Sequence, residues 1–260
     1  MKEFISVSEG NLYCESDGSG RAVVFIHGFS LDSRMWDNQF HIFSQRFQAI
    51  RYDVRGFGKS TLPTGHYDHG DDLARLLSTL GVNVAAVVGL SMGGAIAVNF
   101  VISHPEMVSA IVLADSSIGY MQPSREAVSF GRKIRLEEER EYLDSVKRLW
   151  LADDIFKPAF QNTNLRNAIT AMVNDYSGYH WLHENPVARI DTAYMLEVRR
   201  IEAPAMVIVG EKDVSKHQRV ADLLSRNIPG ARKELIGGAG HMCNMEKPEA
   251  FNDLVLSFLT

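Results

Sequence analysis

Residues 85–104 of this 260-residue chain read AAVVGLSMGGAIAVNFVISH. An apolar run at 85–88 leads into the string Gly-Leu-Ser-Met-Gly, and a helix-like run at 95–101 leads out of it. The string alone is weak evidence, because it arises often by chance. Its setting predicts a strand, a sharp turn and a helix, with a strained serine whose hydroxyl stands clear of the sheet edge. Ser91 is therefore a candidate nucleophile.

A glycine-rich turn between a strand and a helix also occurs at the phosphate sites of dinucleotide-binding folds. Here the pattern Gly-x-Gly-x-x-Gly is absent, and no lysine follows the turn. The sequence therefore favours a nucleophile at this turn over a phosphate site.

The composition limits the class of protein. Hydrophobic residues make up 45% of the chain and the formal net charge is -5, so nothing in the charge suggests a nucleic-acid or acidic-membrane partner. Two cysteines far apart in sequence, Cys14 and Cys243, imply no disulfide framework. The first ten residues alternate charged and apolar side chains, unlike the basic and then apolar pattern of a secretory signal, and no apolar run approaches the length needed to span a membrane. We expect a cytoplasmic protein, a monomer or homodimer, that acts on a small molecule.

Strand-like and helix-like runs alternate through most of the chain, which is typical of a mostly parallel sheet covered by helices. The strand-like runs lie at 4–7, 12–15, 22–26, 48–52, 85–88, 108–113, 205–209 and 232–236. Helical patterns mark 36–47, 73–81, 95–104, 218–227 and 248–259. The chain is therefore predicted to be an α/β protein.

The alternation stops midway along the chain, where charged helical sequence without a strong strand signal takes over, including 132–142 and 164–174. We therefore expect one core domain, formed by 1–117 and 201–260. The segment 118–200 is expected to be an inserted helical cap.

A serine nucleophile needs a base, and the base needs an acid to orient it. His241 is the strongest candidate among nine histidines, because it follows a glycine-rich turn at the end of a predicted strand. Asp213 and Asp115 each follow a strand in the same way. Asp213 is preferred, because the chain order Ser, Asp, His is the one associated with this kind of turn.

Acyl transfer also needs hydrogen-bond donors aimed at the oxygen that becomes negative. The backbone amide of Met92, directly after the serine, is one expected donor, and the amide of Phe29 is the other. We expect His27 to fix this loop by hydrogen bonding, and 53–60 to form a tight turn without chemistry. The expected pocket walls are Phe29, Met92, Trp150 and Met242.

No cofactor and no metal are expected. His66 with His69, and His180 with His183, have spacings that suit a metal, but neither pair has an evident third ligand.

Five motifs in order resemble the α/β-hydrolase superfamily over nearly the whole chain. They are His-Gly-Phe-Ser from 27, Asp-x-Arg-Gly-x-Gly-x-Ser from 53, Gly-Leu-Ser-Met-Gly-Gly from 89, Gly-Glu-Lys-Asp from 210 and Gly-His at 240. The resemblance implies an eight-stranded, mostly parallel sheet with a helical cap inserted after strand six. It also implies the catalytic triad Ser91, Asp213 and His241.

Within the superfamily the chain is most similar to the enol-lactonase and carboxylesterase branch, including 3-oxoadipate enol-lactonases, through Met-Trp-Asp at 35 and Arg-Tyr-Asp at 51. Haloalkane dehalogenases and epoxide hydrolases differ, because they have a carboxylate where this chain has Ser91. The carbon-carbon hydrolases usually have a tryptophan directly after the catalytic histidine, whereas this chain has Met242.

We therefore expect a cofactor-free serine hydrolase that cleaves a small carboxylic ester or lactone through an acyl-enzyme on Ser91. A ligand sensor or signalling protein built on the same fold is the alternative from another class. A carbon-carbon hydrolase, an acyltransferase and a perhydrolase would use the same triad and stay open.

Overall fold

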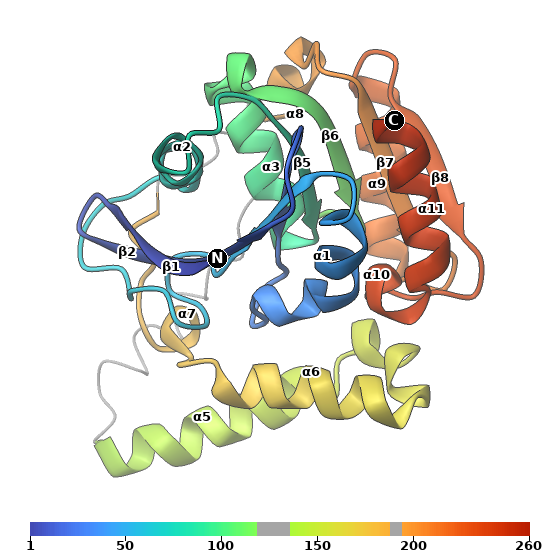
Figure 1. Ribbon diagram of the computed structural model, residues 1–260. Coiled ribbons are helices and arrows are strands. Elements are labelled where there is room, and N and C mark those ends of the chain that lie inside the picture. The colour runs from blue at the N-terminus through green and yellow to red at the C-terminus, as the bar shows by residue number, and fades with distance from the viewer. Residues whose placement is uncertain (119–135, 188–193) are drawn as a thin grey trace.

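A single eight-stranded sheet forms the centre of the molecule in the computed structural model, which describes residues 1–118, 136–187 and 194–260 (Figure 1). The strands are β1 (Lys2–Val7), β2 (Gly10–Asp17), β3 (Ala22–Ile26), β4 (Gln48–Tyr52), β5 (Ala85–Leu90), β6 (Val108–Ala114), β7 (Ala205–Gly210) and β8 (Arg232–Ile236). Their order across the sheet is β1-β2-β4-β3-β5-β6-β7-β8. β2 pairs antiparallel with both β1 and β4, and all other neighbours are parallel. The predicted eight-stranded, mostly parallel sheet is confirmed.

Helices cover both faces of the sheet. They are α1 (Asp37–Phe43), α2 (His69–Thr79), α3 (Met92–Ser103), α5 (Leu136–Leu151), α6 (Thr163–Asp175), α7 (Tyr179–Leu182), α8 (Tyr194–Glu197), α9 (Ser215–Asn227), α10 (Cys243–Glu246) and α11 (Pro248–Leu259). Side chains of α2, α3 and α9 pack in the core on one face, and those of α1 and α11 pack on the other. Because both faces are covered, every residue of β3, β5 and β7 is buried, which explains their continuous apolar runs.

The segment between β6 and β7 is helical in the part that the structure describes. It contains α5, α6, α7 and α8 with three 3-10 turns: η3 (Asp154–Phe156), η4 (Ala159–Gln161) and η5 (Val198–Arg200). Figure 1 shows α5 and α6 packed side by side, apart from the two helical layers that cover the sheet. The helical character expected of this segment is therefore seen.

Several helices differ from the sequence expectation in their bounds: α1 ends at Phe43 instead of 47, and α2 begins at His69 instead of 73. α5 continues to Leu151, beyond the predicted end at 142, and the predicted start at 132 lies outside the described residues. α9 begins at Ser215, three residues before the predicted start. Its first turn shows no strong apolar pattern, because Ser215 and Lys216 face solvent or the rim of a cavity.

The turn from β5 into α3 is held by close backbone contacts. A Cβ atom at Gly93 would lie 2.1 Å from the carbonyl oxygen of Ile26, and one at Gly89 would lie 2.2 Å from the carbonyl oxygen of Gly93. Real Cβ atoms do not approach so closely, so only glycine fits at either position. The two glycines therefore let α3 begin directly against the end of β3.

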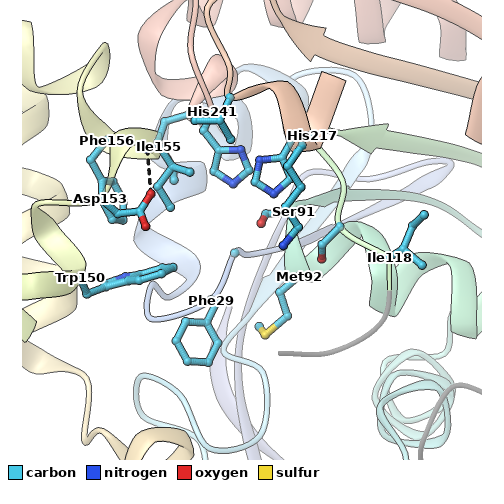
Figure 2. A pocket seen from close by; sticks show the side chains of 15 residues that line it. Phe29, Ser91, Met92, Ile118, Trp150, Asp153, Ile155, Phe156, His217 and His241 are labelled. Carbon is cyan, nitrogen blue, oxygen red and sulfur yellow. Dashed lines mark hydrogen bonds between the residues drawn. The ribbon is translucent and has the colours of Figure 1, made fainter. Parts of the chain in front are cut away.

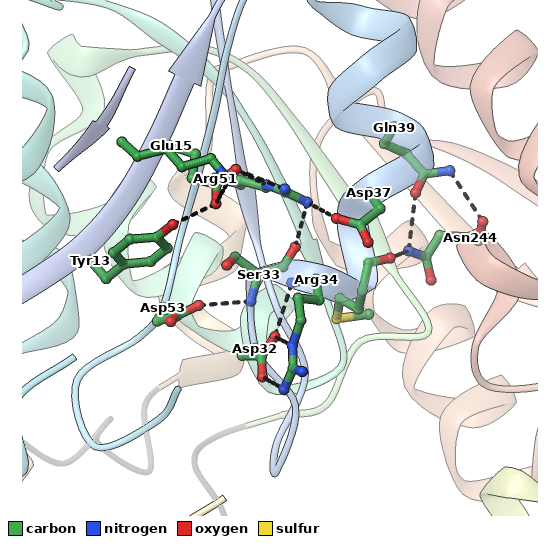
Figure 3. A network of polar contacts seen from close by, with 12 residues as sticks. Tyr13, Glu15, Asp32, Ser33, Arg34, Asp37, Gln39, Arg51, Asp53 and Asn244 are labelled. Carbon is green, nitrogen blue, oxygen red and sulfur yellow. Dashed lines mark hydrogen bonds and ion pairs between the residues drawn. The ribbon is translucent and has the colours of Figure 1, made fainter. Parts of the chain in front are cut away.

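A buried polar network ties the loop after β3 to β4 and β2 (Figure 3). Arg51 donates to Glu15 from Nη2 at 2.8 Å, to the carbonyl oxygen of Ser33 at 3.2 Å, and also pairs with Asp37. Burial opposes the charge on Glu15, yet hydrogen bonds from Tyr13 and Arg51 lower its pKa to about 2. The network fixes the loop that carries Phe29.

We expect Gly93→Ala to lower the free energy of unfolding by about 1–3 kcal/mol, because the new methyl group would meet the Ile26 carbonyl. Urea unfolding followed by circular dichroism measures this change. Gly237→Ala is the matched control, since a Cβ there meets no atom within 4 Å, and its effect should stay within about 0.5 kcal/mol. Equal stability of both variants would contradict the packing argument.

Candidate active site

Ser91 lies at the turn between β5 and α3 with an unusual backbone conformation. Its φ is 56° and its ψ is -114°, a region that side chains other than glycine rarely adopt. The surrounding chain holds this strain: the Ser91 amide donates to the Ala114 carbonyl at 2.9 Å, and the Gly94 amide donates to the Ser91 carbonyl at 3.0 Å. The predicted sharp turn is therefore present, with a polar side chain at its tip.

His241 and Asp213 are hydrogen-bonded partners, as expected from their places after β8 and β7. His241 Nδ1 lies 2.9 Å from Asp213 Oδ2, and both side chains are buried. Asp115 does not take this role, because its Oδ1 accepts from the Gly210 amide at 2.8 Å. The structure thus pairs the candidate base with the preferred carboxylate.

Electrostatics around this pair favour an ionised acid and a neutral base. Burial would raise the pKa of Asp213, but hydrogen bonds from His217 and His241 hold it well below its usual range. Burial lowers the pKa of His241, and the Asp213 charge offsets this only in part. Burial, with the neighbouring Asp213 charge, raises the pKa of Asp115 well above its usual value. Near neutral pH, Asp213 therefore carries the charge and His241 is free to accept a proton.

A second histidine shares the same carboxylate. His217, on α9, places Nδ1 3.3 Å from Asp213 Oδ1. Its ring stacks on the ring of His241, with centroids 4.1 Å apart and planes at 23°. No sequence motif marks His217; the available signal is its position four residues after Asp213, one turn into the following helix.

Ser91 and His241 line one cavity of about 290 Å³ (Figure 2). Loops after β3, β5, β6, β7 and β8 supply one side of it, and α5 with η3 supplies the other. The lining residues are Gly28, Phe29, Ser91, Met92, Ser117, Ile118, Trp150, Asp153, Ile155, Phe156, Val214, Lys216, His217, His241 and Met242. All four residues expected as pocket walls, Phe29, Met92, Trp150 and Met242, are among them.

The two expected amide donors lie at this cavity. Met92 is the first residue of α3, where the helix itself offers no acceptor for the amide. Phe29 follows β3, and the imidazole of His27 fixes the same loop: the Val54 amide donates to Nε2 at 2.9 Å and Nδ1 lies 2.8 Å from the Gly28 carbonyl. Since Nε2 accepts, Nδ1 carries the proton, and His27 has the structural role expected of it.

Aromatic side chains join the segment between β6 and β7 to the loop after β3. Trp150 Nε1 donates to the Ser30 hydroxyl at 2.7 Å, and its ring meets the Phe29 ring edge-on at 5.7 Å between centroids. Tyr176 and Trp181 also pack against Phe29 and do not line the cavity. Of Trp150, Tyr176 and Trp181, only Trp150 lines the cavity.

Histidines of the pairs with metal-like spacing have other partners: His66 Nδ1, for example, lies 3.1 Å from the carbonyl oxygen of Pro186. His180 Nδ1 is 2.7 Å from the Tyr176 hydroxyl, and burial lowers its pKa to about 3. Its neighbour His183 is exposed and packs against Tyr179. Within the described ranges, the group that meets the spacing of metal ligands is instead Asp213, His217 and His241.

Asp153 is a further pocket residue that the sequence did not reveal. One carboxylate oxygen accepts from the Ile155 amide at 3.1 Å and so begins η3, while the side chain borders the cavity opposite the two histidines (Figure 2). It lies in the inserted segment, which has no motif that marks a polar wall residue.

Across residues 1–118, 136–187 and 194–260, the structure contains no helix of the length and apolar character needed to span a membrane.

Comparison with known proteins gives consistent relatives over the full chain. The thermophilic esterase from Thermogutta terrifontis, solved with malate bound, is 25% identical, with coverage of 100% of this chain and 98% of that chain and a TM-score of 0.81. The enol-lactonase from Burkholderia xenovorans LB400 is 25% identical, with 99% coverage of each chain and a TM-score of 0.73. The AB hydrolase superfamily protein YisY of Bacillus subtilis is 28% identical, with 99% coverage of each chain.

The family model described as alpha/beta hydrolase fold matches residues 21–248. Together with the sheet order, this match confirms the resemblance found in the motifs. The chain belongs to the alpha/beta hydrolase fold family.

Proposed function

We propose that this protein is a cofactor-free serine hydrolase that cleaves a small carboxylic ester or lactone. The observation that carries the proposal is the placement of Ser91, on a strained turn, in the same cavity as His241, whose other nitrogen is bonded to Asp213. A strained nucleophile, a neutral imidazole and an ionised acid are the three parts that acyl transfer by serine requires. The relatives named as an esterase and an enol-lactonase support the same reaction class.

In the proposed reaction, His241 Nε2 takes the proton of the Ser91 hydroxyl while Oγ attacks the substrate carbonyl carbon. The tetrahedral intermediate then collapses, the carbon–oxygen bond to the leaving alcohol breaks, and the imidazolium returns the proton to that alcohol. A water molecule, deprotonated by His241, attacks the acyl-enzyme; the bond between the acyl carbon and Ser91 Oγ then breaks, the imidazolium returns the proton to Oγ, and the acid leaves. Asp213 stays ionised throughout and stabilises the imidazolium.

The amides of Met92 and Phe29 are the proposed donors to the negative oxygen. The Met92 amide starts α3, so the positive end of the helix dipole adds to its effect. The Phe29 amide is on a loop held by His27 and by the polar network of Arg51. Donors fixed in this way need no reorganisation when the charge develops.

The segment 118–200 is proposed to act as the cap of this site. Its described helices supply Trp150, Asp153, Ile155 and Phe156 to the cavity, so they would decide which acyl and alcohol groups fit. The chemistry would remain on the loops of the sheet.

Ser91→Ala should lower kcat for p-nitrophenyl acetate by a factor on the order of 10⁴ to 10⁶, because the nucleophile is lost while the helix start is kept. Stopped-flow and steady-state assays of the purified variant measure this. Ser78→Ala is the matched control, since Ser78 is exposed on α2 and should leave kcat unchanged.

Ester hydrolysis at close to the wild-type rate by Ser91→Ala would remove Ser91 from the mechanism. A single burst of p-nitrophenol, equal to the enzyme concentration and without further turnover, would contradict the hydrolase proposal and favour a ligand sensor. Many turnovers with free acid as product support hydrolysis to water.

The acid limb of the pH profile of kcat/KM should have its midpoint below 6.5. The base must be neutral to act, and burial holds the pKa of His241 below that ordinary value, so activity should persist until the pH falls through the lowered pKa. Initial rates from pH 4.5 to 8, with thermal unfolding recorded at each pH, measure the midpoint. A midpoint at 7 or above in a folded protein would contradict the described environment of His241.

Short acyl chains should be preferred, because a cavity of about 290 Å³ is at the lower limit for ligand pockets. We expect kcat/KM for p-nitrophenyl butyrate to exceed that for the octanoate by about tenfold or more. Ile155→Ala, which removes a buried wall of the cavity away from Ser91, should shift this ratio toward the octanoate. Equal kcat/KM for both esters in the wild-type protein would contradict the pocket description.

A further inference from the structure

We propose that His217 is a positioning residue for the proposed base: it holds the Asp213 carboxylate and the His241 ring so that Nδ1 of His241 stays on Asp213 and Nε2 stays free. This inference rests on the proposed serine hydrolase function, because it concerns how the base of that reaction is held. It starts from a feature that the proposed mechanism leaves unused, a second buried imidazole against the first.

The Asp213 carboxylate has partners on both of its oxygens. Oδ2 lies 2.9 Å from His241 Nδ1. Oδ1 accepts from the Val214 amide at 2.7 Å, and His217 Nδ1 lies 3.3 Å from the same oxygen. The torsion that turns a carboxylate is soft, so partners on Oδ1 are needed to keep Oδ2 toward His241. His217 is the side chain that supplies one of them.

The charge on Asp213 decides the direction of the bond from His217. Burial opposes this charge, but hydrogen bonds from His217 and His241 hold the pKa of Asp213 well below its usual range. An ionised carboxylate accepts hydrogen bonds and cannot donate them. His217 therefore carries a proton on Nδ1 and donates it to Oδ1.

The stacked rings limit the rotation of the base. The ring centroids of His217 and His241 lie 4.1 Å apart with the planes at 23°, and both rings line the same cavity (Figure 2). The torsion that turns an imidazole is also soft, and a turn of the His241 ring would drive its edge into the face of His217. The stack therefore keeps the plane of His241 in one orientation.

The place of His217 in the fold makes it a firm support. It lies in the first turn of α9, where its amide donates to the Val214 carbonyl at 2.9 Å, and α9 packs against β7, the strand that leads to Asp213. His217 and Asp213 are thus fixed at the end of the same strand. His241 arrives from the loop after β8 and is held between the carboxylate and the second ring.

Two variants separate the donor from the stack. His217→Phe keeps a flat ring against His241 and removes the donor, whereas His217→Gln keeps an amide donor and removes the ring. Each should lower kcat for p-nitrophenyl acetate by about 10- to 100-fold, because a misplaced catalytic group costs rate. KM should stay within about threefold, because the lost interactions orient the base and do not bind substrate. Arg219→Gln is the control, an exposed residue on the same helix, and should leave kcat unchanged.

Nitrogen-15 NMR of histidine-labelled protein reports the ring nitrogens without any need for activity. In the wild-type protein, His217 and His241 should both be protonated on Nδ1. The downfield proton resonance of His241 Nδ1, which is hydrogen-bonded to Asp213, should shift or broaden in both His217 variants and persist in Arg219→Gln. Circular dichroism checks that each variant is folded.

A lower kcat together with an altered His241 resonance in either variant supports the proposal. A lower kcat with an unchanged resonance, an unchanged kcat in both variants, or a raised KM alone would overturn it, because His217 would then not act through His241. A neutral His217 protonated on Nε2 in the wild-type protein would overturn it even if neither variant folds. If the wild-type protein hydrolyses no ester, the proposed function fails, while the NMR spectra still decide whether His217 holds Asp213 and His241.

Discussion

The close approach of the β5–α3 turn to the end of β3 is the constraint on which the site depends. With no side chain at Gly93, the first turn of α3 lies against the carbonyl of Ile26, and Ser91 is forced into a left-handed backbone conformation. The same approach brings the loop that carries Phe29 beside Ser91, so Ser91, Met92 and Phe29 border one cavity. The core on both faces of the sheet supplies the energy that holds this strain.

Much of this architecture follows from local sequence, for physical reasons. Strands buried on both faces must be apolar throughout, so β3, β5 and β7 stood out as short continuous runs. Ser91, Asp213 and His241 each follow such a strand, and the carboxyl ends of parallel strands share one edge, which predicts their convergence. It was harder to predict which residues between β6 and β7 line the pocket. Trp150 and Asp153 are close in sequence, and both line the cavity. Trp150 is held there by its hydrogen bond to the Ser30 hydroxyl, and Asp153 by the hydrogen bond from the Ile155 amide.

The contact between His217 and His241 could not be predicted from the sequence pattern. A histidine four residues after an aspartate carries no special signal on a helix. The ring of His217 meets that of His241 because β8 and the glycine-rich turn after it place His241 there. The two carboxylate oxygens of Asp213 therefore bind different imidazoles, Oδ1 that of His217 and Oδ2 that of His241. Hydrogen bonds from both histidines lower the pKa of Asp213, so this carboxylate links the rings of His241 and His217.

The hydrogen bond from Trp150 to Ser30 has a mechanical consequence. Ser30, like Ser91, has a positive φ, at 62°, so the loop after β3 is under backbone strain of its own next to Phe29. Any outward displacement of α5 would break this hydrogen bond and separate the indole from the Phe29 ring, which Tyr176 and Trp181 would still cover. A movement of this helix would therefore disturb the strained loop and the cavity wall at the same time, because one tryptophan belongs to the wall and contacts the loop.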